Sequence, residues 1–286
     1  MAKHHYSVMK SDRFFPLFTT QFLGKFNDDL LKKLLLLSLP FAGILDVEGG
    51  SQQLIVLSIG LYVLPFFLFS ASAGLLADQQ EKASFIRRLK LAELAIVALF
   101  AVGVVLSSAT LILGAAFMMG AQTAFFVPFK YSILPEHVEE KLLVGGNGLL
   151  EAGSYIAGLL AIIVALLLGG AGYLLEILTV FMVVAALVGV WCAYKIPAAA
   201  AAAPDLKLNI NLFAESVALF KLARKREAGF LAILGISWFW FVGATFLAQF
   251  PAYAKATLGA DDQVITLFLF IFSAGFVLGA LICGPL

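Results

Sequence analysis

Residues 172–195 read GYLLEILTVFMVVAALVGVWCAYK, with one internal acid and one lysine at the end. A helix that crosses a bilayer needs about 20 consecutive, mostly apolar residues. This run therefore predicts a membrane-spanning helix. The whole chain has the same character, because 62% of its 286 residues are apolar and only 13% are charged. A soluble domain carries about a quarter charged residues.

Seven further apolar runs have a similar length. We therefore expect an all-α polytopic membrane protein with eight visible spans. The polar leader, residues 1–13, precedes an apolar run that is too long for a signal peptide and lacks a small-residue cleavage site, so we expect the first span to be retained. The seven runs lie near 14–44, 53–77, 86–107, 109–132, 144–169, 228–254 and 262–286.

Basic residues are distributed unevenly between alternate connections. The leader and the connections 78–88, 133–143 and 196–227, with their flanks, hold most of the lysines and arginines, and the other connections hold only Lys255. Lysine and arginine concentrate on the cytoplasmic side of membrane proteins. The pattern predicts a cytoplasmic N-terminus.

The connection 196–227 divides six spans from the last two. It begins with an alanine tract, Pro197 to Pro204, and continues into a stretch with one apolar face. That stretch predicts an amphipathic helix at the inner-leaflet surface, with a plain solvated linker as the alternative. The residues of the apolar face are Leu212, Phe213, Ser216, Val217, Phe220 and Ala223.

A weak internal repeat supports this division. A shift of 211 positions superposes Gly24 on Gly235, Leu36 on Leu247, Pro40 on Pro251 and Gln52 on Gln263. Two six-span halves related by a parallel repeat are the plan of one large transporter class. We therefore expect 1–195 to be a first six-span half, 196–227 a linker, and 228–286 two spans of a second half, eight of twelve in all.

The first span contains charges that a lipid-facing helix would not carry, since each costs about 2.5–3.5 kcal/mol on insertion scales. At helical spacing, Gln21, Lys25, Asp28 and Lys32 form one stripe, which predicts a polar cavity. The alternative is that 14–33 is a surface amphipathic helix, although 34–45 is too short to span alone. The charged residues of this span are Lys25, Asp28, Asp29, Lys32 and Lys33.

The fifth span repeats this logic. A polar face, which includes Asn147, Glu151 and Ser154, lies opposite a stripe of small residues suited to close helix packing. We expect Glu151 to face the cavity, to pair with a first-span lysine, or both. Lys130, at the end of the fourth span, either extends to the inner interface or binds a phosphate.

Other candidates are weaker. Glu93 and Glu176 are expected at interfaces. Trp238 and Trp240 either face lipid at an interface or, through the repeat, lie opposite the first-span polar residues. The cysteines and histidines are scattered, so no metal, cofactor or enzymatic constellation is expected. The net charge of +1 gives no basic field for nucleic acid.

Three stretches resemble known transporters. Gly74 to Asp78, followed by Gln79, Arg87 and Arg88, resembles the loop signature of the major facilitator superfamily. Residues 21–32, QFLGKFNDDLLK, and 128–136, PFKYSILPE, followed by 147–152, NGLLEA, resemble its bacterial lysophospholipid transporter branch. Together the matches span most of residues 14–165.

This resemblance implies a twelve-span transporter that flips lysophospholipids, especially lysophosphatidylethanolamine, across the bacterial inner membrane towards the cytoplasmic leaflet for reacylation. Relatives are sometimes fused to acyltransferase and acyl-carrier synthetase domains, which makes such an enzyme a candidate partner beside the membrane lipids. The family's acids match Asp28 and Glu151. The chain departs from the family's usual pattern at Lys25, Asp29 and Lys33.

From the residues and the resemblance together, we expect Asp28 and Glu151 to receive the ethanolamine ammonium, and Lys32 or Lys130 to attract the phosphate. The expected substrate-binding residues are Gln21, Asn27, Asp28, Lys32, Lys130, Asn147, Glu151 and Trp238, and the expected gating or structural residues are Gly74, Asp78, Arg87 and Arg88. Two alternatives stay open. One is a proton-coupled transporter of another small amphiphile, and the other is a non-transporting membrane module that docks a lipid-modifying enzyme.

Overall fold

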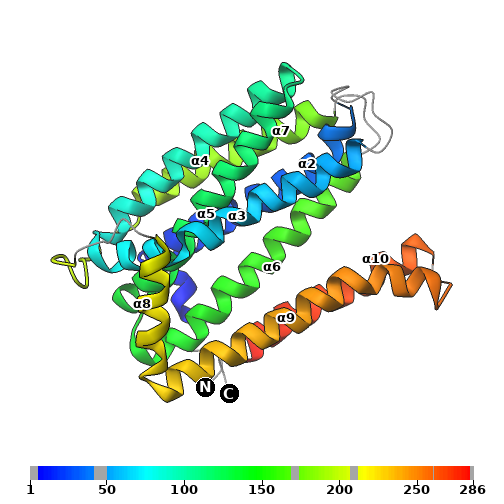
Figure 1. Cartoon of the computed structure of the whole chain (residues 1–286). Coiled ribbons are helices and arrows are strands. Elements are labelled where there is room, and N and C mark those ends of the chain that lie inside the picture. Colours follow the sequence, from blue (N-terminus) through cyan, green and yellow to red (C-terminus); the bar gives the residue numbers. More distant parts are fainter. Residues whose placement is uncertain (1–5, 42–49, 169–173, 207–211, 260, 284–286) are drawn as a thin grey trace.

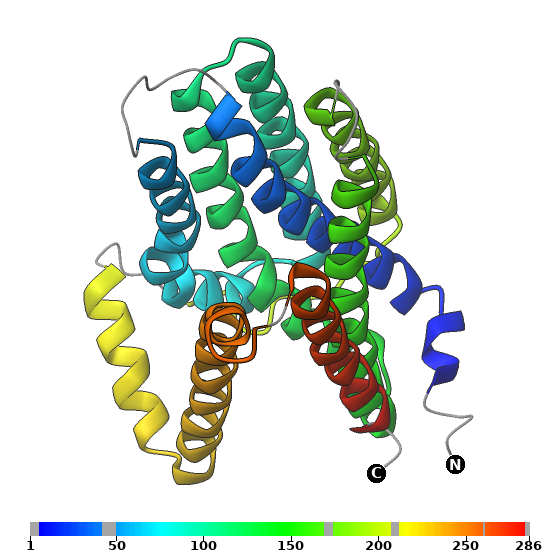
Figure 2. The same ribbon diagram turned by 90° about the vertical axis from the view of Figure 1, so that its right-hand side faces the viewer.

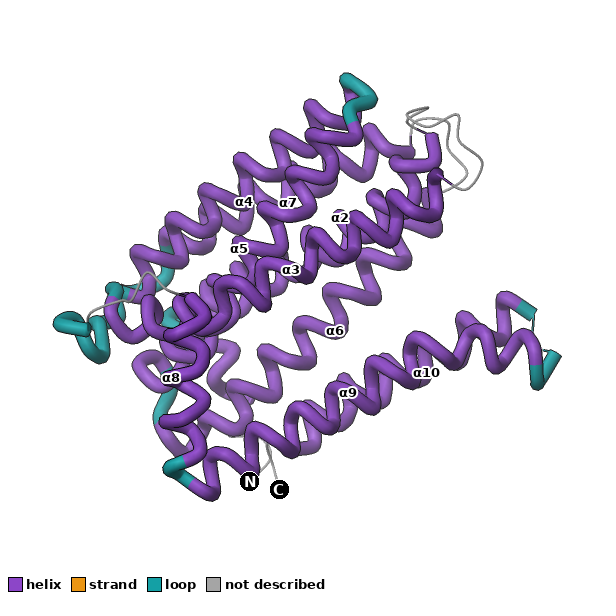
Figure 3. Tube along the Cα trace, in the orientation of Figure 1, coloured by secondary structure: helices purple, strands orange, loops and turns teal. Residues whose placement is uncertain are grey.

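The computed structural model describes residues 6–41, 50–168, 174–206, 212–259 and 261–283 (Figure 1). Within these ranges the regular structure is entirely helical, as Figure 3 shows, so the all-α prediction is confirmed. The helices are α2 (Phe14–Phe41), α3 (Gly50–Gln79), α4 (Lys82–Val105), α5 (Ala109–His137), α6 (Leu143–Leu168), α7 (Leu174–Tyr194), α8 (Leu212–Arg224), α9 (Glu227–Ala256) and α10 (Asp262–Cys283), with short 3-10 turns η1 (Tyr6–Lys10) and η2 (Glu140–Leu142).

Each apolar run corresponds to one helix, and the expected amphipathic segment forms α8. Five helical segments of the described chain are long and apolar enough to cross a membrane, so the protein is a multi-pass membrane protein. They are Val56–Gln79, Ala109–His137, Glu140–Ala165, Leu175–Tyr194 and Glu227–Phe246. The full count of eight spans stays a prediction.

Helices α2 to α7 form one bundle (Figures 1 and 2). In it α3 packs on α5, α4 packs on α5 and α7, and α2 packs on α6 and α7. Helices α9 and α10 run beside this bundle, and α10 packs on α6 (Figure 2). A Cβ at Gly148 of α6 would lie only 2.4 Å from the backbone oxygen of Ala280, and the Tyr155 ring stacks on Phe276 with centroids 4.7 Å apart. Glycine therefore permits the close approach of α10 to α6.

Helix α2 lies at the centre of the bundle. Phe14 and Leu17 belong to one buried apolar cluster, Leu30 and Leu34 belong to a second, and all four are fully buried. The buried polar residues of α2 lie between the two clusters, and the seven-residue spacing from Thr20 to Asn27 and from Gln21 to Asp28 keeps each pair on one helix face. The alternative that 14–33 is a surface helix is therefore wrong.

The alanine tract, Pro197 to Pro204, forms an ordered strap. It lies along the connection between α3 and α4, where the backbone N–H of Ala199 donates to Glu81 Oε1 at 2.8 Å and the N–H of Lys82 donates to the Ala199 oxygen at 3.1 Å. Lys82 Nζ donates to the Ala200 oxygen at 2.6 Å, and Gln79 Nε2 donates to the Leu206 oxygen at 2.7 Å. The segment after α7 is thereby fixed to the connection between α3 and α4.

Two of the four expected gating or structural residues, Asp78 and Arg87, contact the segment that contains this strap. Arg87 Nη2 donates to the Ile196 oxygen at 2.8 Å, and the Asp78 backbone oxygen accepts from the N–H of Ala203 at 2.8 Å. Arg88 is exposed, and a Cβ at Gly74 would meet nothing within 4 Å. Arg87 therefore has a visible packing role, and a gating role for any of the four stays a prediction.

Candidate functional site

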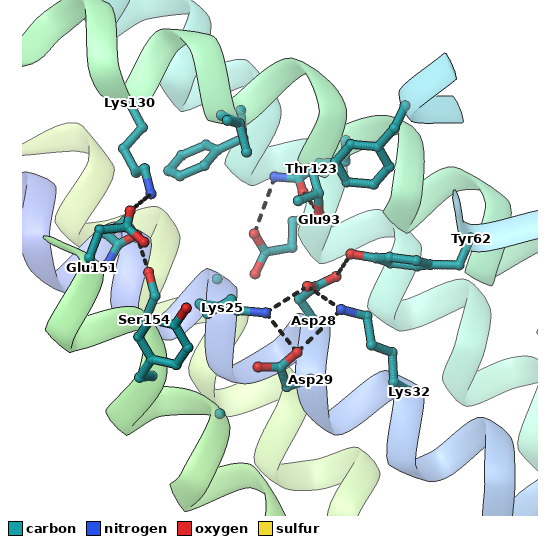
Figure 4. A pocket seen from close by; sticks show the side chains of 18 of the residues that line it. Lys25, Asp28, Asp29, Lys32, Tyr62, Glu93, Thr123, Lys130, Glu151 and Ser154 are labelled. Atoms are coloured by element: carbon teal, nitrogen blue, oxygen red, sulfur yellow. Dashed lines mark hydrogen bonds and ion pairs between the residues drawn. The ribbon is translucent and has the colours of Figure 1, made fainter. Parts of the chain in front are cut away.

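A cavity of about 940 Å³ lies between the bundle and the α9–α10 pair. Helices α2, α3, α4, α5 and α6 contribute its polar residues, and Trp240, Ala244 and Ser273 contribute from α9 and α10. Figure 4 shows the polar side chains converging from separate helices. The predicted polar cavity is present, and α2 supplies a large share of its wall.

The charges of α2 form an ion-pair ladder (Figure 4). Lys25 Nζ lies 2.7 Å from Asp29 Oδ1 and 3.5 Å from Asp28 Oδ2. Lys32 Nζ lies 2.9 Å from Asp28 Oδ2 and 3.2 Å from Asp29 Oδ1. Opposite charges three and four residues apart in a helix are neighbours, so the two acids offset two of the lysines within one helix.

Asp28 is the more deeply buried acid, with 4% of its side chain exposed. The Tyr62 hydroxyl of α3 donates a hydrogen bond to its Oδ1, and the Lys32 ammonium lies 4.3 Å from the centre of the Tyr62 ring. Asp28 is thus held from both sides. Sequence reasoning missed Tyr62, although a tyrosine within an apolar run signals that its hydroxyl needs a partner.

A second polar cluster lies on α4. Lys90 Nζ and Glu93 Oε2 are 2.5 Å apart, with side-chain exposures of 1% and 2%. Asn27 Nδ2 donates to Glu93 Oε1 at 3.0 Å, and Gln122 Nε2 lies 3.4 Å from Glu93 Oε2. The expectation that Glu93 is interfacial is therefore wrong. Two opposite charges three residues apart inside an apolar run were the signal for this pair.

The third cluster joins α5 to α6. Lys130 Nζ lies 3.3 Å from Glu151 Oε1, which also accepts a hydrogen bond from the Tyr131 hydroxyl. Glu151 pairs with this α5 lysine and not with a first-span lysine. The Lys130 side chain is only 8% exposed, so it does not extend to the interface.

Gln21 connects α2 to the same face of α6. Its Nε2 donates to the Leu150 oxygen at 2.8 Å, and its Oε1 accepts from Ser154 Oγ at 3.3 Å. A glycine permits a further close approach between the two helices, since a Cβ at Gly158 of α6 would lie 2.7 Å from Asp29 Oδ2 of α2. The polar face of α6 predicted from its sequence therefore meets the polar face of α2.

The expected substrate-binding residues divide into two groups. Those on the cavity wall are Gln21, Asp28, Lys32, Lys130 and Glu151. Asn27 is buried behind the wall at Glu93, Asn147 is exposed away from it, and Trp238 is 67% exposed and does not line it. Of the two tryptophans that the repeat indicated, Trp240 lines the cavity. Within the described ranges, no three acids, histidines or cysteines converge as a metal site would require.

The chain is similar to curated lysophospholipid transporters. The lysophospholipid transporter LplT of Citrobacter koseri is 29% identical over 279 residues, which cover 91% of this chain and 62% of the relative. LplT proteins of Escherichia coli match with the same identity and coverage. No protein-family model matches the chain. The relatives confirm the resemblance to this transporter branch, and the chain spans about 62% of their length.

Proposed function

We propose that this chain is part of a transporter that flips lysophospholipids, with lysophosphatidylethanolamine as the representative substrate, across the bacterial inner membrane. The relatives carry the name lysophospholipid transporter, which supports the substrate class. In this proposal the N-terminus is cytoplasmic, transport runs towards the cytoplasmic leaflet, and an acyltransferase there reacylates the product.

The main support for the proposal is that the cavity is lined by both charged and aromatic side chains. Its walls present three ion-paired groups, one on α2, one on α4 and one between α5 and α6, whereas Phe66, Phe126 and Trp240 contribute aromatic surface. Its volume lies near the upper end of the range of about 300–1,000 Å³ typical of small-molecule sites. A lysophospholipid has this same division between a charged head group and a single acyl chain.

Exchange of ion-pair partners is the proposed binding chemistry. The ethanolamine ammonium of the head group approaches Asp28 or Glu151, and the phosphate approaches the lysine that the acid releases. The acid and the lysine of the protein are then each paired both before and after binding, so neither is left as an uncompensated buried charge. Alternating access between two six-span halves, in the manner of the major facilitator superfamily, moves the bound head group across the membrane.

A proton-coupled transporter of another small amphiphile is the second candidate. The Lys90–Glu93 pair favours it, because intramembrane acids with a specific partner are the groups that proton relays use. Flipping that is indifferent to the proton gradient selects the first candidate, and proton uptake that accompanies substrate selects the second.

The test uses vesicles that contain the full-length protein and fluorescent lysophosphatidylethanolamine, with an external quencher to report transbilayer movement. We expect the double variant Asp28→Asn, Glu151→Gln to lose flipping. Glu176→Gln is the matched control, because Glu176 is exposed in the first turn of α7, and it should flip at the wild-type rate. Wild-type flipping by the double variant rejects the site.

A further inference from the structure

The charges on the cavity wall do not balance. Five lysines and four acids line the cavity, which leaves one positive charge in excess. Each acid has at least one lysine within 4.0 Å, and four of the five lysines have an acid partner. Among the described residues, Lys33 is the cavity lysine with no acid within that distance.

The position of Lys33 explains why its neighbours do not neutralise it. It follows Asp29 by four residues on α2, yet Asp29 Oδ1 is already occupied by Lys25 and Lys32. The polar segment of α2 thus contains three lysines and two acids. An ammonium without a counterion is costly at membrane depth, and it is tolerated where a water-filled cavity or an anion solvates it.

We propose that Lys33 binds the phosphate of the lysophospholipid head group, an inference that rests on the proposed function. Lys32 and Lys130, the lysines expected from the sequence, must each release an acid before they can bind an anion. Lys33 needs no such exchange, so it forms a charge-assisted hydrogen bond with a phosphate oxygen without a compensating loss. Lys33 is therefore the first phosphate contact, and the ion pairs around Asp28 and Glu151 rearrange afterwards.

The experiment measures binding to the purified full-length protein. The probes are lysophosphatidylethanolamine and a monoacylglycerol with the same acyl chain, which lacks the phosphate. The first two variants are Lys33→Gln, which removes the charge, and Lys33→Arg, which keeps it. The control is Lys141→Gln, which removes an exposed lysine in η2, far from Lys33 in the sequence.

We expect Lys33→Gln to weaken lysophosphatidylethanolamine binding by about tenfold or more, as loss of one hydrogen bond to a charged group predicts. Monoacylglycerol binding should stay unchanged, which also shows that the variant is folded. Lys33→Arg should keep most of the affinity, and Lys141→Gln should match the wild type for both lipids.

Three results would overturn the inference. Lys33→Gln could bind lysophosphatidylethanolamine like the wild type, or it could lose both lipids equally, which indicates a structural role. Glycerol 3-phosphate could displace the lysolipid at equal concentration, which indicates a site for free phosphate esters. A wild-type protein that binds neither lipid instead rejects the proposed function itself.

Discussion

The contact between α3 and α5 at Gly120 offers a sharp test of the packing that positions the site. A Cβ at Gly120 would lie 2.0 Å from the backbone oxygen of Tyr62, and ordinary contact begins at 3.4 Å. Gly120→Ala therefore forces two backbones apart by about 1.4 Å, the difference between these distances. No flexible side chain can absorb this displacement.

The displacement should affect both stability and the site. Overpacking of this kind costs about 1–3 kcal/mol. Because Tyr62 moves with α3, its hydrogen bond to Asp28 is strained as well. We expect Gly120→Ala to lower the midpoint of thermal unfolding in detergent by several degrees and to reduce flipping.

Gly114→Ala is the control on the same helix, because a Cβ at Gly114 would meet nothing within 4 Å. It should leave the unfolding midpoint unchanged or slightly raised, since alanine favours helix over glycine by about 1 kcal/mol. Equal midpoints for Gly120→Ala and the wild type would refute the close packing of α3 on α5.

Three further predictions address other contacts. Gly158→Ala places a Cβ 2.7 Å from Asp29 Oδ2, the end of a flexible side chain, so lysolipid affinity should fall while the unfolding midpoint hardly changes; an unchanged affinity contradicts this. Lys90→Met leaves Glu93 charged and buried, so it should lower the free energy of unfolding, measured by denaturant titration, by about 3–5 kcal/mol. The double variant Lys90→Met, Glu93→Gln should recover most of that loss. Additive losses from the two substitutions would argue against the ion pair. Burial opposes ionisation of Glu81, but the backbone N–H groups of Ala199, Ser84 and Ala83, and then Arg87, hold the pKa of its carboxyl below the ordinary value. The strap should therefore stay docked above about pH 4.3, the ordinary glutamate pKa, and detach as the pH falls through the lower folded-state pKa of Glu81. Hydrogen exchange at the Ala199 amide measures this detachment. The variant Glu81→Gln should detach the strap at neutral pH.

The helices were predictable because their signals are local. Apolar runs of sufficient length located α2 to α7, α9 and α10, and one-sided apolarity located α8. The ladder between Lys25, Asp29 and Lys32 was also readable, since residues three and four apart are neighbours on any helix.

Contacts between helices were not predictable from local patterns. The sequence indicated that Glu151 faces a polar region, but only the packing of α5 on α6 selects Lys130 as its partner. The same holds for Tyr62 at Asp28 and for Asn27 at Glu93. Docking of the alanine tract was not predictable either, because backbone groups, which every residue has, make most of the hydrogen bonds that hold it.

The most direct test of lysophospholipid transport is the rate of lysophosphatidylethanolamine movement across vesicles with and without the full-length protein. Diacyl phosphatidylethanolamine serves as the comparison, since it has the same head group and a second acyl chain. We predict that the protein accelerates movement of the lysolipid and that Asp28→Asn combined with Glu151→Gln abolishes the acceleration. Equal rates in protein-containing and protein-free vesicles would contradict it.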